Sequence, residues 1–265
     1  MKIISLNAWG GAMFDSLVEW LPDCGADILC LQEVTCTNGL HGTTRFDDGE
    51  RSLPQRANLY ADVCATLPNH QGVFLTSDSG PVYDELGNRH QQDFGIALFV
   101  HQRIPIVSTE STFVHGTHVD HREWPISDRP RVAHAARLFD RVSDRYVTIV
   151  HLHGLRDSAG KADSPSRISQ AHRLADLTTR VRSKGDFVIV CGDLNLTPES
   201  ETFRILANIG LVDLVGKSDT RTSKYKKPGR HANYMLVSNP ERVIQFSIPS
   251  TPEVSDHRFL ALEFQ

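Results

Sequence analysis

The residues best suited to chemistry follow a short apolar run in the last third of the chain. Residues 187–191 read Phe-Val-Ile-Val-Cys, a pattern typical of a strand buried on both faces, and Gly192, Asp193, Leu194 and Asn195 come next. Side chains alternate along a strand, so Asp193 and Asn195 leave its end on the same face. A carboxylate beside an amide could orient a water molecule and bind a metal ion. The simpler interpretation is that both residues form or cap a turn.

Other polar residues stand at the ends of predicted strands, and together they form an oxygen-rich set. Glu33 follows the apolar run at 26–31, where a metal ion is a better partner for its carboxylate than solvent. Mg²⁺ prefers oxygen ligands and keeps several waters, so one or two carboxylates suffice, and Mn²⁺ is an alternative. Phosphoester hydrolysis uses such a metal, an activated water and histidine. The strand-end residues are Asn7, Glu33, His153, Asp193, Asn195, Asp256 and His257.

Composition narrows the class of protein. The chain has 265 residues, a formal net charge of −4 and no linker-like run, so we expect one domain over residues 1–265. The acidic total argues against coating long duplex DNA, although a local basic patch can coexist with it. The five cysteines are odd in number and show no CxxC pair, which indicates reduced thiols. Without a signal-peptide pattern or a spanning apolar run, we expect a cytoplasmic monomer that does not bind membranes.

Strand and helix patterns alternate, but several strand pairs have no helix between them. We predict helices over residues 13–22, 52–67, 164–185 and 197–210, and a surface loop over residues 35–52. The second helix would begin with Ser52 as its N-cap and Pro54 in its first turn. Strands are predicted over residues 2–7, 26–31, 94–100, 104–114, 132–139, 146–152, 187–191, 234–237 and 259–264. This mixture favours an α/β sandwich with mixed sheets over a pure Rossmann arrangement.

Cationic and aromatic residues outside the strand ends could contact a phosphate substrate. Arg131 leads into a predicted strand and is well placed to reach a phosphate, and Arg167 lies in the first turn of a predicted helix. The stretch 221–230 is rich in Lys and Arg and contains Tyr225, which could stack on a base; the alternative is a solvated loop. The expected substrate-binding residues are Arg131, Arg167, Lys224 and Tyr225.

Three histidines crowd the segment 115–131. His115, His118 and His121 could suggest a second metal site, but neither a strand nor a helix pattern would bring all three together. A solvated or substrate-facing loop is therefore the simpler interpretation of this segment.

Five short motifs occur along the chain in a fixed order. They are Leu6-Asn7, Leu31-Gln32-Glu33, His151-Leu152-His153-Gly154, Gly192-Asp193-Leu194-Asn195 and Ser255-Asp256-His257. In this order they resemble the endonuclease/exonuclease/phosphatase superfamily, which has the DNase I-like and exonuclease III-like fold, over the whole chain. The resemblance implies a four-layer α/β sandwich: two mixed β-sheets packed face to face, with helices on the outer faces. It also implies Mg²⁺-dependent hydrolysis of a phosphodiester or phosphomonoester by in-line attack of water.

The resemblance also implies a role for each strand-end residue. Glu33 would be the main Mg²⁺ ligand, with Asn7 beside it and Asp256 against the metal site. Asp193 would orient and deprotonate the water, and Asn195 would hold the nucleophile or the phosphate. His257 would bind the phosphate and stabilise its developing charge, and His153 would contact the phosphate from the other side.

One position departs from the family pattern. Asn233 stands before Tyr234 where the family usually has Asp, and that Asp ordinarily pairs with the histidine that matches His257. The same kind of Asp→Asn change in a serine-protease triad costs about 10⁴ in rate. The accounts left open are a slow natural enzyme, a different histidine partner, or an inactivating substitution. Our hypothesis from sequence is that Asn233→Asp raises turnover.

The leading functional hypothesis is a Mg²⁺-dependent nuclease that acts on single-stranded nucleic acid or nucleotide ends. A second enzyme hypothesis is a small-molecule phosphatase or a phospholipid phosphodiesterase of the same fold. A relation to enzymes that clear phosphotyrosyl-DNA ends also fits the motifs. The non-enzyme hypothesis is a catalytically weakened binding module, with Asn233 as its mark.

Overall fold

Two β-sheets and four α-helices make up the regular structure of residues 1–157 and 159–265, which the computed structural model describes. One sheet contains β1 (Lys2–Asn7), β2 (Ile28–Cys36), β3 (Thr43–Asp47), β4 (Ser52–Arg56), β5 (His70–Tyr83), β6 (Arg89–His101), β13 (Val243–Ser247) and β14 (Leu260–Phe264). The other contains β7 (Ile106–His115), β8 (Arg131–Asp140), β9 (Arg145–His153), β10 (Phe187–Asp193), β11 (Val212–Asp213) and β12 (Asn233–Val237). The helices are α1 (Phe14–Trp20), α2 (Leu59–Thr66), α3 (Pro165–Val181) and α4 (Glu201–Ala207).

The strand order places a parallel pair inside each mixed sheet. The orders are β13-β14-β1-β2-β6-β5-β3-β4 and β11-β12-β10-β9-β8-β7. β1 runs parallel to β2, and β9 runs parallel to β10, while their other neighbours are antiparallel. The carboxyl ends of a parallel pair lie at the same edge of the sheet, so polar residues at those ends are brought together.

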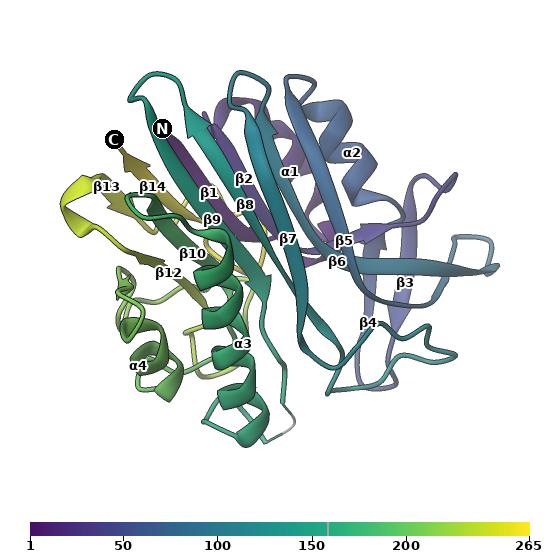
Figure 1. The fold of residues 1–265 in the computed structure, drawn as a ribbon. Coiled ribbons are helices and arrows are strands. Elements are labelled where there is room, and N and C mark those ends of the chain that lie inside the picture. The colour runs from purple at the N-terminus through teal and green to yellow at the C-terminus, as the bar shows by residue number, and fades with distance from the viewer. Residues whose placement is uncertain (158) are drawn as a thin grey trace.

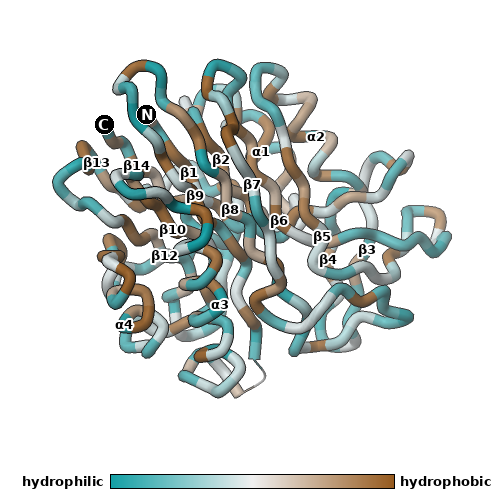
Figure 2. The backbone as a smooth tube through the Cα atoms, in the orientation of Figure 1, coloured by the Kyte–Doolittle hydropathy of each residue, from teal (hydrophilic) through white to brown (hydrophobic). Residues whose placement is uncertain are grey.

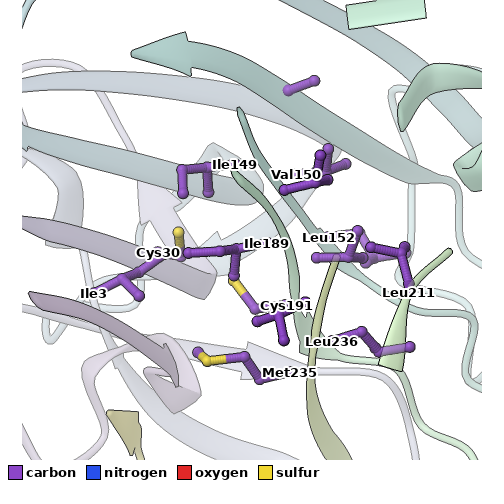
Figure 3. Close-up of a cluster of buried hydrophobic side chains, with 14 of the residues drawn as sticks. Ile3, Cys30, Ile149, Val150, Leu152, Ile189, Cys191, Leu211, Met235 and Leu236 are labelled. Carbon is purple, nitrogen blue, oxygen red and sulfur yellow. The ribbon is translucent and has the colours of Figure 1, made fainter. Parts of the chain in front are cut away.

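The sheets pack face to face, and helices cover both outer faces (Figure 1). Between the sheets, Ile3 and Cys30 lie against Ile189, Cys191 and Met235 of the other sheet (Figure 3). α1 and α2 bury their apolar sides on the outer face of the larger sheet, and α3 and α4 lie on the smaller sheet. The hydrophobic residues accordingly follow the strands and inner helix faces, while most connecting loops are hydrophilic (Figure 2). The predicted four-layer α/β sandwich is confirmed.

The prediction for residues 35–67 was wrong in part. Residues 43–47 form β3 instead of a loop, with Thr44 and Phe46 buried in alternation. Residues 52–56 form β4 instead of a helix, and the helix α2 starts only after its N-cap Asn58, whose side chain accepts from the Ala61 amide at 3.1 Å. Pro54 is tolerated in β4 because this strand ends the sheet and has a neighbour on one side only. The hairpin β3–β4 projects away from α3 and α4 (Figure 1).

The other element predictions hold with small shifts. α3 begins as expected, with Ser164 accepting from the Arg167 amide and Pro165 at its first position. α4 starts later than predicted, because Ser200 caps it rather than Thr197. The sequence reading missed β5, β11 and β13. No helix in the described part of the chain is both long and apolar enough to cross a bilayer.

Two buried histidines interrupt the apolar layer between the sheets. His134 and His151 pair in register on β8 and β9, and His151 is also in register with Cys191, which faces the other sheet. Their rings lie 5.5 Å apart at 63°. Both ring nitrogens of His151 and Nδ1 of His134 lack a hydrogen-bond partner among the described residues. Burial lowers the pKa of His134 to about 4 and pulls the pKa of His151 well below its ordinary value.

These histidines should make folding stability depend on acid. Their pKa values are lower in the folded state than in the unfolded state. The free energy of unfolding is therefore highest above about pH 6.5 and decreases as the pH falls towards 4, because the unfolded chain then binds protons that the folded chain does not. For His134 alone, the loss between pH 7 and pH 5 should be about 2 kcal/mol of unfolding free energy. When both proteins are unfolded with denaturant at pH 7 and pH 5, the decrease in unfolding free energy should be smaller in His134→Leu than in the parent by about this amount. The exposed His172→Leu is the matched control, and equal losses in His134→Leu and the parent would contradict the assignment.

Candidate active site

The strand-end residues of the two parallel pairs meet between the sheets. Asn7 ends β1 and lies in register with Gln32, next to Glu33 of β2. On the opposite sheet, Asp193 ends β10 in register with His153, which ends β9. Gly192 is required just before Asp193, because it has φ +143° and a Cβ there would lie 2.0 Å from the Leu152 carbonyl oxygen.

Glu33 reaches the site because of an irregularity in its strand. The sequence suggested that β2 ends before Gln32, but the strand continues to Cys36 through a register shift between Gln32 and Val34. Glu33 occupies this bulge with φ +54°, a left-handed conformation that is unfavourable for a residue with a side chain. Bulges and strained backbone conformations of this kind concentrate at functional sites, where they redirect a side chain.

Three side chains form a compact candidate metal centre. Ligand atoms of Glu33, His153 and Asp193 all lie within 4.8 Å of one another. His153 Nε2 is 3.6 Å from Glu33 Oε1 and 3.9 Å from Asp193 Oδ2. The Asn7 amide nitrogen donates to Glu33 Oε1 at 3.1 Å and to Asp193 Oδ2 at 2.9 Å. The Asn7 side-chain oxygen accepts from the Trp9 amide at 2.9 Å, so Asn7 bridges the two carboxylates through its nitrogen in this structure, and its role as a metal ligand stays a prediction.

Electrostatics favour a cation at this centre. Burial raises the pKa of Asp193, but the neighbouring His153, the cations Arg221 and Lys161, and the Asn7 hydrogen bond outweigh burial and hold this pKa below its ordinary value. Burial depresses the pKa of His153, which leaves a neutral imidazole able to bind a metal. The Asp193 carboxylate and the acidic side chain of Glu33 thus lie beside a neutral ring, an arrangement that suits a divalent ion.

Asp256 lies apart from the three-residue cluster. It accepts from Arg221 Nη1 at 2.9 Å, and its pKa rises to about 7, chiefly by burial, against the lowering effect of Arg221 and with a further increase from Glu33 and Asp193. Its cationic partner is Arg221, which the sequence analysis treated only as part of a basic stretch, and the placement of Asp256 against the metal stays a prediction.

His257 faces the carboxylate of Asp193 from the other side. Its Nε2 is 3.5 Å from Asp193 Oδ2, and its Nδ1 is hydrogen-bonded to Asn233 Oδ1 at 2.8 Å. Asn233 therefore takes the place that the family gives to Asp, and the account in which His257 has a different Nδ1 partner is wrong. Asn195 completes the group, with its amide nitrogen 3.4 Å from His153 Nε2 and its backbone amide donating to Asp193 Oδ1 at 3.0 Å.

A cleft of about 470 Å³ opens onto these residues. Among its described lining residues, ten are Lys or Arg and only four are Asp or Glu, so the cleft is cationic although the chain as a whole is acidic. Trp9, Phe46 and Phe94 add aromatic surface. The cations are Arg51, Arg129, Arg131, Arg156, Lys161, Arg167, Arg221, Lys224, Lys226 and Lys227.

The four predicted substrate-binding residues all line the cleft but differ in availability. Lys224 is exposed, and Tyr225 stacks under Arg221 with its ring centre 4.1 Å from the guanidinium carbon. Arg131 is buried and donates to the carbonyls of Gly154 and Pro130. Arg167 is fully buried and donates to the Asn195 carbonyl at 2.5 Å and to the Gly160 carbonyl at 2.6 Å, so it fixes the loop after β10.

The histidines of segment 115–131 do not form a second metal site among the described residues. His115 contacts Asp128 at 2.8 Å, His121 contacts Asp78 at 3.1 Å, and His118 lies 3.3 Å from the Ser79 hydroxyl. The same segment instead supplies Arg129, which donates twice to the buried Asp78 carboxylate and stacks on Phe94 and Trp124.

Sequence reasoning missed Lys161, Arg156 and the role of Arg221. Lys161 Nζ donates to the backbone carbonyls of Gly229 and His231, and burial lowers its pKa to about 8. Arg156 has a buried Nη1 without a partner in the described structure. These residues lie on loops after β9 and before β12, where periodicity gives no signal; only their position near strand-end motifs could have indicated them.

Comparison with known protein families decides the assignment. The family model described as "Endonuclease/Exonuclease/phosphatase family" matches residues 4–257. The chain belongs to the endonuclease/exonuclease/phosphatase family. The match extends from β1 to His257 and so includes every strand-end motif. No curated protein sequence matches the chain.

Solved structures share this family fold at low sequence identity. The mannosyl-6-phosphatase Bt3783 of Bacteroides thetaiotaomicron is 16% identical with a TM-score of 0.67, and the alignment covers 100% of this chain and 99% of that one. The human Nocturnin catalytic domain with bound sulfate is 20% identical with a TM-score of 0.64, covering 100% and 93%. TDP2 of D. rerio, complexed with a single-strand DNA product, is 15% identical with a TM-score of 0.63, covering 100% and 98%.

The donor set fits the divalent metal that members of this phosphoesterase family use. Glu33 and His153 supply a carboxylate and a neutral imidazole as ligands, and the Asn7 amide holds the Asp193 carboxylate next to that of Glu33. The raised pKa of Asp256 fits as well, because a nearby cation would relieve the repulsion among these acidic groups.

Metal binding should depend on Glu33. Calorimetric titration of the parent with Mg²⁺ should show a single site, and Glu33→Gln should weaken that site by about 100-fold or more because it removes a charged ligand. Glu85→Gln, at an exposed hairpin turn, makes the same charge change and should bind like the parent. Equal Mg²⁺ affinity of Glu33→Gln and the parent would exclude this centre.

Proposed function

We propose that this protein is a Mg²⁺-dependent phosphodiesterase that acts on single-stranded nucleic acid or nucleotide ends, as predicted from sequence. The observation that carries the proposal is the Glu33–His153–Asp193 centre at the base of a cationic cleft. A metal site alone fits many hydrolases. A metal site surrounded by Lys and Arg fits a substrate that carries several phosphates.

The geometry supports hydrolysis by direct attack of water. A bound divalent ion would supply Lewis acidity at a phosphoryl oxygen, held by Glu33 and His153. Asp193 would accept the proton of the water whose oxygen forms the new bond to phosphorus, while the ester P–O bond opposite breaks and the leaving oxygen takes a proton from solvent. Asn195 and His257 flank Asp193 and are positioned to hold the water and the phosphoryl oxygens.

The solved relatives support this range of substrates without selecting one. TDP2 of D. rerio was crystallised with a single-strand DNA product, and human Nocturnin with sulfate, an analogue of phosphate. Bt3783 is described as a mannosyl-6-phosphatase, and a cleft of about 470 Å³ also suits a small phosphomonoester, which is the second candidate.

The class of reaction can be tested with generic substrates. The parent should hydrolyse bis(4-nitrophenyl) phosphate in Mg²⁺ and stop when the metal is chelated, and Asp193→Asn should reduce kcat by about 100-fold or more because it removes the base. Asp176→Asn, on the exposed side of α3, should retain parental activity. Activity on 4-nitrophenyl phosphate alone would favour the phosphomonoester candidate. No hydrolysis of either substrate, with Mg²⁺ binding intact, would overturn the proposal.

The basic rim tests the nucleic-acid part of the proposal. Changing Lys224, Lys226 and Lys227 to Glu should weaken cleavage of a single-stranded oligonucleotide. The slope of log affinity against log salt concentration should become shallower by about 2, as expected for the loss of three phosphate contacts. Hydrolysis of the small generic substrate should remain at the parental level. Lys184→Glu, an exposed lysine in the turn before β10, is the control. An unchanged salt slope would remove the rim from the binding site.

A further inference from the structure

The three tryptophans of the chain have different surroundings. Trp20 stacks on Phe259, with ring centres 4.7 Å apart, and Trp124 is buried and packs on Phe46, with ring centres 5.4 Å apart. Trp9 is half-buried and lines the cleft. Its indole therefore offers the cleft a flat apolar surface, whereas the rings of the other two tryptophans pack within the protein.

Trp9 stands next to the candidate metal centre. Its backbone amide donates to the side-chain oxygen of Asn7 at 2.9 Å. The nitrogen of the same side chain donates to Glu33 and to Asp193. The position of the tryptophan is thus tied to the side chain that bridges the two carboxylates. A group attached to a phosphate at this centre would therefore lie close to the indole.

The backbone at Trp9 is strained. Its φ is +52°, in the left-handed region that is unfavourable for a bulky side chain. The next two residues, Gly10 and Gly11, also have positive φ values of +60° and +72°, and glycine is the residue that such a turn ordinarily uses. A glycine at position 9 would relieve the strain, so the indole is held at the cleft in spite of it. Strained residues concentrate at functional sites, where a particular side chain must be presented.

The hairpin β3–β4 forms the wall of the cleft beside Trp9. Gln55 of β4 packs over Gly10, where an added Cβ would lie 2.9 Å from the Gln55 Cδ atom. Leu53 lies on the same face of β4 as Gln55, and its partner in register on β3 is Phe46; all three residues line the cleft. The amide oxygen of Gln55 has no hydrogen-bond partner among the described residues, and a glutamine amide can turn about its last torsion to present either end to a ligand.

We propose that Trp9 is the platform on which a nucleobase of the substrate stacks, and that Gln55 contacts the edge of this base. The proposal rests on the phosphoester hydrolysis proposed above, and it narrows the substrate to a phosphoester that carries a base next to the reacting phosphate. Aromatic side chains stack on any base, and a glutamine amide matches the donor and acceptor groups of a base edge. A base fits this wall better than a sugar, because sugar hydroxyls would face Leu53 and Phe46 without hydrogen-bond partners.

The test compares two phosphonates, in which a CH₂ group replaces the ester oxygen so that the protein cannot hydrolyse them. One is the analogue of adenosine 5′-phosphate, and the other is the analogue of ribose 5-phosphate, which lacks the base. In Mg²⁺, the parent should bind the adenosine analogue at least about tenfold more tightly, and Trp9→Leu should reduce this preference to about twofold or less. Trp9→Phe keeps a ring and should retain most of the preference. Trp20→Leu is the matched control and should bind like the parent.

Two further measurements identify the residues that meet the base. The adenosine analogue should quench the fluorescence of the parent and of Trp20→Leu but not that of Trp9→Leu, because stacking on a base quenches an indole. Gln55→Leu, which is similar in size, should weaken the adenosine analogue by about fivefold and leave the ribose analogue unchanged. Gln71→Leu, at an exposed position of β5, should affect neither analogue. Thermal unfolding identifies any variant that fails to fold.

These binding measurements do not depend on catalysis. If the protein hydrolyses neither generic substrate but shows the preference for the base that depends on Trp9, the reaction class fails and the base subsite stands. If it hydrolyses bis(4-nitrophenyl) phosphate and the parent binds both phosphonates equally, the reaction class stands and the base subsite is overturned. Equal weakening of both analogues in Trp9→Leu would place the sugar on the indole and would also overturn the proposal.

Discussion

The site depends on one side chain that holds two like charges together. The Asn7 amide nitrogen donates to Glu33 on its own sheet and to Asp193 on the opposite sheet, and so joins the two halves of the sandwich where their parallel strands end. Without a donor between them, two carboxylates so close together and partly shielded from water would repel each other, or one of them would take up a proton. The hydrogen bonds therefore keep the centre ready for a divalent cation, and the face-to-face packing of the sheets keeps Asn7 in place.

The acidic centre is surrounded by cations, which reconciles a mildly acidic chain with a phosphate substrate. Net charge is a property of the whole surface, whereas binding depends on the charges that face the cleft, and these are mostly Lys and Arg. His257 contacts one neutral and one cationic side chain: Asn233 adds no charge, and Arg221 supplies a positive one.

The strand-end chemistry could be predicted because it follows from the pattern of buried strands. The apolar run before Asp193 and its neighbour Asn195 predicts both the strand and the direction of the side chains, and the order of the motifs predicts the fold. Bulges, edge strands and loops could not be predicted in the same way. Glu33 reaches the site because it adopts a left-handed backbone conformation at a bulge inside β2. Pro54 is accommodated in β4 because this strand lies at the edge of the sheet. The contact of Arg221 with His257 joins two loops that no local pattern connects.

The site is also assembled from residues that are distant in the chain, and this affects when it can form. The Ser255 hydroxyl donates to the Asn7 carbonyl across 248 positions, and Asn7 reaches Asp193 across 186. Contacts of such long range form late in folding, because their loop-closure entropy is offset only after much of the core is in place. During synthesis from the N-terminus, the strands that carry Asn7 and Glu33 emerge well before His257 exists. A growing chain would therefore have no complete strand-end site until its last strands are made.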